Sequence, residues 1–215
     1  MGAYDYISLL QGAAVTISLS LTGIVLGVPL GLALALVRWA RVPVLARAVA
    51  FYVSVLRATP MVTFALLVFF AMPNIGVPID PVPAAILALS LNTSAFNCEI
   101  WRAALNDFPR SQIDAATAAG MTPALAFRRI IFPQIWRISL PGLVNEMTLL
   151  IKSSPAIAVV GIVDITRAAV RIGAQTYEPL PPFLVATVLY FLVILGFVQV
   201  QRAIEAHMDR KFGFA

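Results

Sequence analysis

A run of four residues, Lys152-Ser153-Ser154-Pro155, could bind a polar solute inside an apolar stretch of this chain. A lysine ammonium attracts a carboxylate, serine hydroxyls can accept hydrogen bonds from an ammonium group, and a proline leaves backbone carbonyls without their helical partners. The nearest acidic residue, Glu146, lies six residues earlier, which is not a helical spacing. Two interpretations of Lys152 stay open: a place on the path of a solute, or a salt bridge between helices with Glu146 as partner.

Glu99 and Arg57 also lie in or beside apolar stretches and are candidates for the same path, and Glu146 lies within such a stretch as well. A charge at membrane depth costs at least about 2.5 kcal/mol, so it normally faces a cavity or a charged partner. Glu99 precedes Arg102 by one helical turn, and this spacing fits either an ion pair that anchors a helix end or a place on the solute path. For Arg57 we expect a role in gating or packing in preference to direct contact with the solute.

The composition indicates what kind of chain positions these charges. The chain is 60% hydrophobic and 12% charged, with a mean hydropathy of +0.92, whereas soluble domains carry about 25% charged residues. It is therefore predicted to be an all-α membrane protein that crosses the bilayer several times. Its single cysteine excludes an intramolecular disulfide, and its one histidine and scattered acidic residues form no metal-binding pattern.

Apolar stretches predict where the chain crosses the bilayer, since a spanning helix needs about 20 apolar residues. Five spans are predicted within one transmembrane domain over residues 1–215. The second is short unless the preceding segment joins it, and the fourth is too long for one straight crossing. The predicted spans are residues 13–37, 59–72, 84–104, 134–163 and 183–201.

Glycines and prolines mark two features within these spans. Gly23, Gly27 and Gly31 recur at every fourth position, which places them on one face of the first span. That pattern indicates either a surface for close helix packing or the ordinary tolerance of glycine in membrane helices. In the fourth span, we expect Pro141 and Pro155 to interrupt the helix.

Basic residues predict the orientation of the chain, because cytoplasmic loops carry most of the lysine and arginine. Eleven of the fifteen basic residues lie on one side if the first loop, the loop after the third span and the C-terminal tail are cytoplasmic. We therefore predict an external N-terminus and a cytoplasmic C-terminus. The basic excess follows from topology and not from nucleic acid binding. The eleven residues are Arg38, Arg41, Arg47, Arg102, Arg110, Arg128, Arg129, Arg137, Arg202, Arg210 and Lys211.

The segment 110–133, between the third and fourth predicted spans, is too polar to be a span and too long to be a turn. Its alanine-rich part, residues 113–119, favours a helix. Gly120 is placed to end that helix in the left-handed conformation that glycine adopts readily.

A second short helix is predicted after this turn. Thr122 suits the N-cap and Pro123 the first helical position, while Pro133 is expected to end the helix. Such a small, smooth surface fits the groove of another protein, although a solvated loop between two spans has the same composition.

The spacing within this segment resembles the signature loop of bacterial ABC importer permeases. That family has Glu-Ala-Ala, three residues, Gly, nine residues and Ile-x-Leu-Pro. Here Asp replaces Glu and Phe replaces Leu, while every gap is kept. In the family this loop carries the cytoplasmic coupling helix, which docks on the ATP-hydrolysing subunit. The resemblance assigns ATPase coupling to Asp114, Ala115, Ala116, Gly120, Ile130, Phe132 and Pro133.

Other short motifs resemble the polar amino acid branch of the same family and cover about half of the chain. The main departure begins at Lys152, where the branch has Lys-Asp-Thr-Ser-Leu and this chain has Lys-Ser-Ser-Pro-Ala. That departure leaves the identity of the solute open. The matching motifs are Arg57-Ala-Thr-Pro60, Ala95-Phe96-x-x-Glu99-x-x-Arg102, Pro133-Gln134, and the spacing of Pro141, Asn145 and Lys152.

The resemblance implies the membrane-spanning subunit of an ATP-driven importer for polar amino acids or related compounds such as opines. The implied partners are a cytoplasmic ABC ATPase dimer, a second permease subunit, identical or homologous, and an external solute-binding protein, all at the bacterial cytoplasmic (inner) membrane. No Walker A sequence occurs in this chain. ATP and Mg are therefore expected to serve the partner ATPase, and this chain is expected to bind no cofactor and to be no enzyme.

Two other classes of protein remain as alternatives. A stand-alone secondary transporter or channel usually has more spans or an internal repeat, and it would have no use for the segment 110–133. An intramembrane enzyme would need a catalytic motif, and neither Gly-x-Ser-x-Gly nor His-Glu-x-x-His occurs. Copurification with an ATPase subunit would separate the importer from both.

Overall fold

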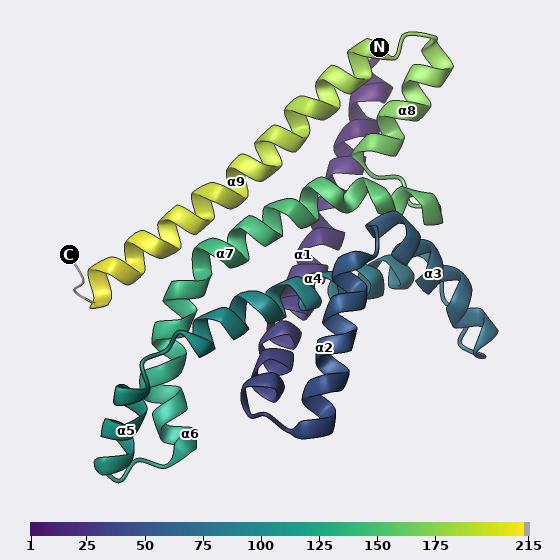
Figure 1. Cartoon of the computed structure of the whole chain (residues 1–215). Coiled ribbons are helices and arrows are strands. Elements are labelled where there is room, and N and C mark those ends of the chain that lie inside the picture. Colours follow the sequence, from purple (N-terminus) through teal and green to yellow (C-terminus); the bar gives the residue numbers. More distant parts are fainter. Residues whose placement is uncertain (213–215) are drawn as a thin grey trace.

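The computed structural model describes the backbone of residues 1–212 and the side chains of residues 1–200, Arg202, Ala203 and Ala206. Within that part every regular element is a helix, as the composition predicts. Figure 1 shows the N-terminus and the far end of α9 at opposite ends of an elongated bundle. The elements are α1 (Ala3–Trp39), α2 (Pro43–Ala58), α3 (Met61–Asn74), α4 (Pro81–Asn106), α5 (Arg110–Ala118), α6 (Pro123–Ala126), the π-helix η1 (Phe127–Ile131), α7 (Phe132–Ser153), the 3₁₀ helix η2 (Ser154–Val160), α8 (Ile165–Thr176) and α9 (Leu180–Phe212).

Helices α1 and α4 pack along the glycine face of α1. A Cβ atom added to Gly27 would lie 2.0 Å from Cγ2 of Thr93 and 2.8 Å from the carbonyl oxygen of Ser90. A Cβ atom added to Gly31 would lie 2.8 Å from Cβ of Asn97. These distances are shorter than van der Waals contact, so only glycine allows the two backbones to come this close. The packing interpretation of the glycine stripe is confirmed.

Helix α4 lies at the centre of the bundle, in contact with α1, α2, α3 and α7. Its buried faces carry polar side chains such as Ser94 and Asn97, and the hydroxyl of Tyr52 on α2 lies 2.8 Å from the hydroxyl of Ser94. The predicted span 84–104 lies within α4, but this helix is not among those apolar enough to cross a membrane by composition alone. Its neighbours cover it, so its side chains meet protein and need not be lipophilic.

Helices α2 and α3 form one bent unit. Neither α2 nor α3 is long enough to span a bilayer, and the two meet at an angle of 115° around Thr59 and Pro60. Pro60 has no N–H to donate, and the hydroxyl of Thr59 turns back to the carbonyl oxygen of Val55 at 2.7 Å. The predicted span 59–72 is therefore the second half of a broken element that begins at Pro43.

The fourth predicted span contains one break and not two. Helix α7 stays helical through Pro141, where an interruption was predicted, although it bends along its length (Figure 1). Prolines are tolerated inside membrane helices when the freed backbone groups find other partners. Pro155 does change the helix: η2 replaces α7 from Ser154, and the chain leaves helical structure at Gly161, which has a φ of 103°.

The first turn of the segment 110–133 has the predicted geometry. Gly120 follows α5 with a φ of 74°, and the N–H of Met121 donates to the carbonyl oxygen of Ala116 at 3.0 Å, which closes the helix end. The hydroxyl of Thr122 accepts a hydrogen bond from the N–H of Leu125 at 3.3 Å, so Thr122 is the N-cap of α6 as predicted.

Pro133 does not end the second helix, and that prediction is wrong. The chain passes from α6 through η1 directly into α7, and the N–H of Phe132 donates to the carbonyl oxygen of Phe127. This wider π-type turn keeps Phe132 helical although a proline follows it. Helices α6, η1 and α7 consequently form one continuous helical segment, which bends within α7 (Figure 1).

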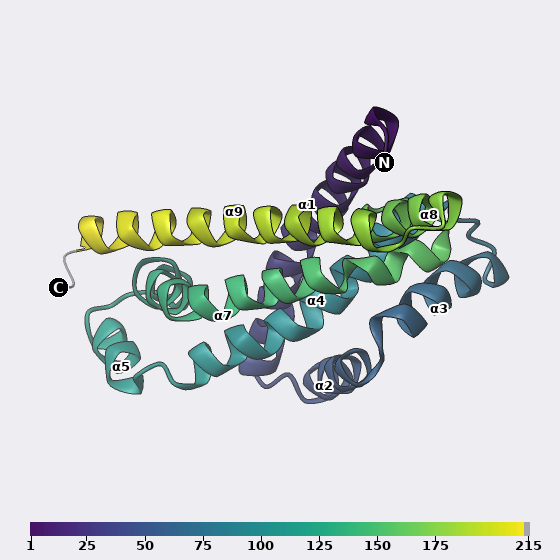
Figure 2. The ribbon, with the colours of Figure 1, turned by 90° about the horizontal axis from the view of Figure 1, so that it is seen from above.

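Helices α8 and α9 form a hairpin that contacts the N-terminal part of α1. Asp164 caps α8, because its Oδ1 atom accepts a hydrogen bond from the N–H of Arg167 at 2.8 Å, and the hydroxyl of Tyr190 on α9 donates to its Oδ2 atom at 3.2 Å. Figure 2 shows α9 along one face of the bundle, with α7 between α9 and α4. Only 6% of the apolar part of α9 is buried, as expected of a helix that faces lipid.

By length and composition, three continuous helical segments of the described chain could cross a membrane, and the bent pair α2–α3 is a fourth. The three segments differ from the predicted spans in their ends. Helix α1 begins at Ala3 and not at residue 13, because Asp5 accepts a hydrogen bond from the N–H of Gly2 at 2.7 Å and stabilises the helix start. Helix α9 runs to Phe212, past the predicted end at residue 201. The side chains of Arg210 and Lys211, two of the predicted cytoplasmic charges, lie outside the described part. The three segments are Ala3–Trp39, Pro123–Val160 and Leu180–Val200.

Candidate functional site

A pocket of about 260 Å³ lies between the α2–α3 break, α4 and α7. Two buried polar side chains contribute to its wall, Asn92 from α4 and Glu146 from α7. Thr59 and Ser153 add hydroxyl groups. The pocket can therefore offer a carboxylate, an amide and two hydroxyls to a small polar molecule. The rest of the wall is apolar and consists of Met61, Phe96, Leu149 and Leu150.

Glu146 is the most unusual group in this pocket. Its side chain is buried, and within the described part of the chain it forms no hydrogen bond and no ion pair. The guanidinium of Arg57 lies within electrostatic range of its carboxylate but forms no ion pair with it. The guanidinium of Arg57 lies 5.4 Å from the ring centroid of Phe96, in a cation–π contact at the edge of the pocket. From its place in an apolar span Glu146 was expected to face a cavity or a partner, but it was considered only as a partner for Lys152 and was not predicted as a site residue.

One residue of the predicted run Lys152-Ser153-Ser154 reaches the pocket. Ser153 lines it, with its hydroxyl donating to the carbonyl oxygen of Leu150 at 3.0 Å, while Ser154 is completely buried outside the lining. Lys152 is exposed and forms no ion pair with Glu146 or any other described residue. Six residues of α-helix rotate its side chain about 120° from that of Glu146. The proposed salt bridge between them is therefore absent within this chain.

Glu99 is held in an ion-pair cluster near the C-terminal end of α4. The guanidinium of Arg102 donates to its Oε2 atom twice, from Nε at 2.9 Å and from Nη2 at 2.7 Å. Its Oε1 atom pairs with Arg38 at the end of α1. Both carboxylate oxygens are engaged, which is the anchoring arrangement that the spacing of Glu99 and Arg102 allows. The contact with Arg38 crosses from one helix to another and could not be predicted from local spacing.

The seven coupling-motif residues divide by exposure. Ala116 is buried, and Ile130 and Phe132 are half-buried against the bundle. The remaining four, which are Asp114, Ala115, Gly120 and Pro133, are exposed. The inward side chains hold the loop in place, and the outward ones leave a small polar and alanine surface that a partner could contact.

Aromatic rings and one amide pair attach the loop to the rest of the bundle. The ring centroid of Phe132 lies 5.9 Å from that of Phe127 and 6.1 Å from that of Trp136. Trp136 in turn lies 5.7 Å from the buried Trp101 of α4. Gln134 of α7 donates a hydrogen bond to Gln112 of α5 at 2.8 Å. The loop therefore has a fixed geometry relative to α4 and α7.

Comparisons with known proteins agree with this geometry. Residues 27–210 match the family described as binding-protein-dependent transport system inner membrane component. The chain is 33% identical to the arginine transport system permease protein ArtQ of Bacillus subtilis over 198 residues, 92% of this chain and 90% of that protein. It is 31% identical to the histidine/lysine/arginine/ornithine transport system permease protein HisQ of Salmonella typhimurium, over 88% of this chain and 84% of that protein.

A solved structure of an amino acid ABC transporter with histidines superposes with a TM-score of 0.83 at 31% identity and covers 94% of both chains. The MetNI methionine ABC transporter superposes with a TM-score of 0.75 at 20% identity, over 95% of this chain and 99% of that chain, which shows the shared fold. This chain thus belongs to the family of binding-protein-dependent transport system inner membrane components and is a multi-pass permease subunit of an ABC transporter.

Proposed function

We propose that this permease imports polar amino acids, basic ones in particular, across the bacterial cytoplasmic membrane. The observation that carries the substrate class is the buried carboxylate of Glu146, which faces a pocket whose lining contains no lysine or arginine. A carboxylate without a hydrogen bond at membrane depth suits an ammonium or guanidinium group. The names of ArtQ and HisQ, which refer to arginine and to histidine, lysine, arginine and ornithine, support the same class.

The solute path proposed here passes the Glu146 pocket. Arg57 lies over Phe96 and within electrostatic range of Glu146, with which it forms no ion pair. A cationic amino acid that enters the pocket supplies the ion pair that Glu146 lacks and repels the guanidinium of Arg57, so Arg57 serves as a gate and not as a ligand. Asn92 and Ser153 then offer hydrogen bonds to the α-amino and α-carboxylate groups. Lys152, exposed beside the pocket, remains a candidate for a path shared with a second subunit.

The proposed topology has five crossings, with the N-terminus outside and the C-terminus inside. Helices α1, α7 and α9, the bent pair α2–α3 and the enclosed α4 supply these crossings. Five helices do not enclose a path by themselves, so two permease subunits, identical or homologous, would line it together. The exposed residues of the coupling motif would face a cytoplasmic ATPase dimer that uses ATP and Mg, and an external binding protein would deliver the solute.

The test is arginine uptake by the reconstituted complex of permease, ATPase and binding protein. Glu146→Gln removes the charge at constant size and should lower arginine uptake by about tenfold or more, since a charged hydrogen bond contributes about 1.5–3 kcal/mol. Basal ATP hydrolysis should persist, because the coupling loop is unchanged. Asn145→Asp is a matched control that adds a carboxylate at an exposed position of the same helix and should leave uptake near that of the wild type.

Three results would contradict the proposal. Full arginine uptake by Glu146→Gln would remove the pocket from the solute path. Hydrolysis of ATP by the purified chain alone would contradict the proposal that a separate subunit hydrolyses ATP. Failure of the chain to copurify with any ATPase would favour the stand-alone transporter or channel.

A further inference from the structure

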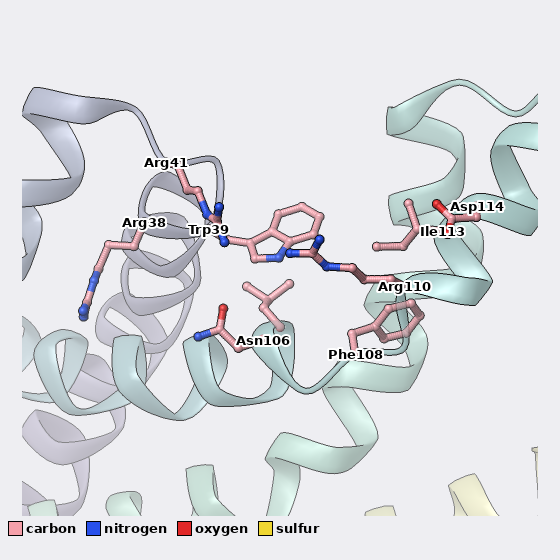
Figure 3. A pocket seen from close by; sticks show the side chains of 9 residues that line it. Arg38, Trp39, Arg41, Asn106, Phe108, Arg110, Ile113 and Asp114 are labelled. Carbon is pink, nitrogen blue, oxygen red and sulfur yellow. The ribbon is translucent and has the colours of Figure 1, made fainter.

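A second pocket, of about 340 Å³, lies between the C-terminal end of α1 and the start of α5. Figure 3 shows that Trp39 and Arg41, from the end of α1 and the turn after it, lie across this pocket from Arg110, the first residue of α5. Leu105 and Phe108 are buried beneath it. The pocket therefore combines guanidinium groups with an aromatic ring and an apolar floor.

The charge of this pocket is strongly positive. Arg38, which also lines it, is already paired with Glu99. Arg41 and Arg110 form no ion pair within the described part of the chain. The one acidic residue of the lining, Asp114, forms no ion pair with either of them. Two guanidinium groups are thus left available to a negatively charged group from outside the chain.

The backbone holds Arg41 in an unusual conformation. Its φ is 54°, in the left-handed region that a non-glycine residue adopts at a cost in energy. The N–H of Arg41 donates to the carbonyl oxygen of Arg38 at 3.2 Å, and that of Ala40 donates to Leu36 at 2.8 Å. In this turn the side chain of Arg41 extends toward Trp39 and the pocket (Figure 3). A strained residue that faces a pocket indicates a position kept for binding.

We propose that this pocket binds the phosphate group of an anionic phospholipid from the cytoplasmic leaflet. Guanidinium groups bind phosphate with two parallel hydrogen bonds, and a tryptophan at the end of a span lies at the depth of the lipid headgroups. The apolar floor of Leu105 and Phe108 can contact the glycerol and the first methylene groups of a lipid. A free inorganic anion has no apolar part that would make this contact. The inference rests on the proposed orientation, which places this end of α1 in the cytoplasm.

A lipid bound here would connect α1 to α5. Arg41 follows α1, whereas Arg110 begins the helix that carries the coupling motif. The phosphate would hold these two elements together and hold the coupling loop in its position. Anionic lipid would then stabilise the loop, and the stabilisation would weaken at high salt.

The test measures the melting temperature of the purified, assembled transporter in detergent with added lipid. Phosphatidylglycerol should raise the melting temperature, whereas phosphatidylcholine and inorganic phosphate at the same concentration should not. The double variant Arg41→Gln, Arg110→Gln should lose this shift. Arg47→Gln, which removes an exposed arginine of α2 that does not line the pocket, should keep it.

Three outcomes would overturn the inference. The first is an equal rise in melting temperature with inorganic phosphate, which would indicate a site for a soluble anion. The second is a lipid-induced rise that persists unchanged in the double variant. The third is an equal loss of this rise in Arg47→Gln, which would indicate diffuse attraction of lipid to the basic surface. If the double variant does not assemble, the variant Arg41→Lys, Arg110→Lys keeps both charges but removes the geometry for two parallel hydrogen bonds to phosphate. A weaker lipid-induced rise in melting temperature would then support the site, and an unchanged rise would contradict it. Arginine uptake by the wild-type complex is measured separately from the melting temperature. The proposed function can therefore fail while the lipid-induced rise in melting temperature persists, and this rise can be absent while arginine uptake is normal.

Discussion

The α1–α4 interface and the loop after α5 both depend on glycine, for different physical reasons. At Gly27 the backbone is ordinary helix, and the space for a side chain is already filled by Thr93 and Ser90. At Gly120 the space is open, but the φ of 74° is one that side-chain-bearing residues disfavour. The first glycine serves packing and the second serves chain direction. Substitutions at the two positions should consequently fail in different measurements.

The largest effect is expected at the interface. Gly27→Ala places a methyl group 2.0 Å from Cγ2 of Thr93, so α1 and α4 must move apart. Overpacking of this kind typically costs about 1–3 kcal/mol and occasionally more, and a contact of 2.0 Å lies at the costly end. The melting temperature and yield of the purified complex should fall sharply. Gly196→Ala on α9, where nothing lies within 4 Å of the added atom, should leave both near the wild-type values. Equal behaviour of the two variants would show that the interface is looser than described.

Gly120→Val should fail in coupling and not in folding. A β-branched residue with positive φ costs about 1–2 kcal/mol, which the loop can relieve by changing its direction. The complex should assemble and melt like the wild type, while stimulation of ATP hydrolysis by solute and binding protein is lost. Gly120→Asn tolerates the left-handed conformation and should retain most of that stimulation. Normal stimulation in the valine variant would contradict the assignment of the loop.

The same comparison extends to charges, because Glu99 is engaged by two arginines while Lys152 is engaged by none of the described residues. Arg38→Gln removes the link between α1 and α4 but leaves the bidentate contact of Arg102 with Glu99. The side chains are about one-fifth exposed, so we expect a loss of about 1 kcal/mol in unfolding free energy, measured as a modest fall in melting temperature. A fall as large as that of Gly27→Ala would indicate that the ion pair organises the interface.

Lys152→Met should have the smallest effect. With no partner to lose among the described residues, the variant should change the free energy of unfolding by no more than about 0.5 kcal/mol, so its melting temperature should stay close to that of the wild type. Arginine uptake should fall less than in Glu146→Gln. Loss of assembly that Glu146→Gln restores would instead reveal an ion pair between subunits. Uptake as low as that of Glu146→Gln would place Lys152 directly on the solute path.

The sequence was most informative where a local pattern has one physical cause. The four-residue recurrence of Gly23, Gly27 and Gly31 indicated the packing face of α1, and the order of Gly120 and Thr122 gave the turn between α5 and α6. The coupling motif predicted a docking loop at 110–133, and four of its seven residues are exposed there, while the docking itself stays a prediction.

Contacts between distant segments could not be predicted in this way. Arg38 and Glu99 are 61 residues apart, and no local spacing indicates that they meet. The approach of Arg57 to Glu146 is of the same kind. Pro133 was wrongly predicted to end a helix, because the rule for prolines assumes an α-turn and the chain uses a wider π-turn there. The Glu146 pocket was missed for a related reason: its wall comes from three elements that only the fold brings together.

The unbroken passage from α6 into α7 has a mechanical consequence. The helix is continuous from Pro123 but bends within α7 (Figure 1, Figure 2), and a proline such as Pro141, which lies inside α7, is the usual cause of such a bend. From Phe132 to Pro141 the helix rises over nine residues, a length of about 14 Å. If the ATPase tilts the loop by about 5°, a lever of that length moves its far end by about 1 Å, which is enough to lengthen a hydrogen bond beyond its usual range. A flexible joint at Pro133 would absorb this displacement. The stiffness of the bend would then determine how much of the movement reaches Glu146.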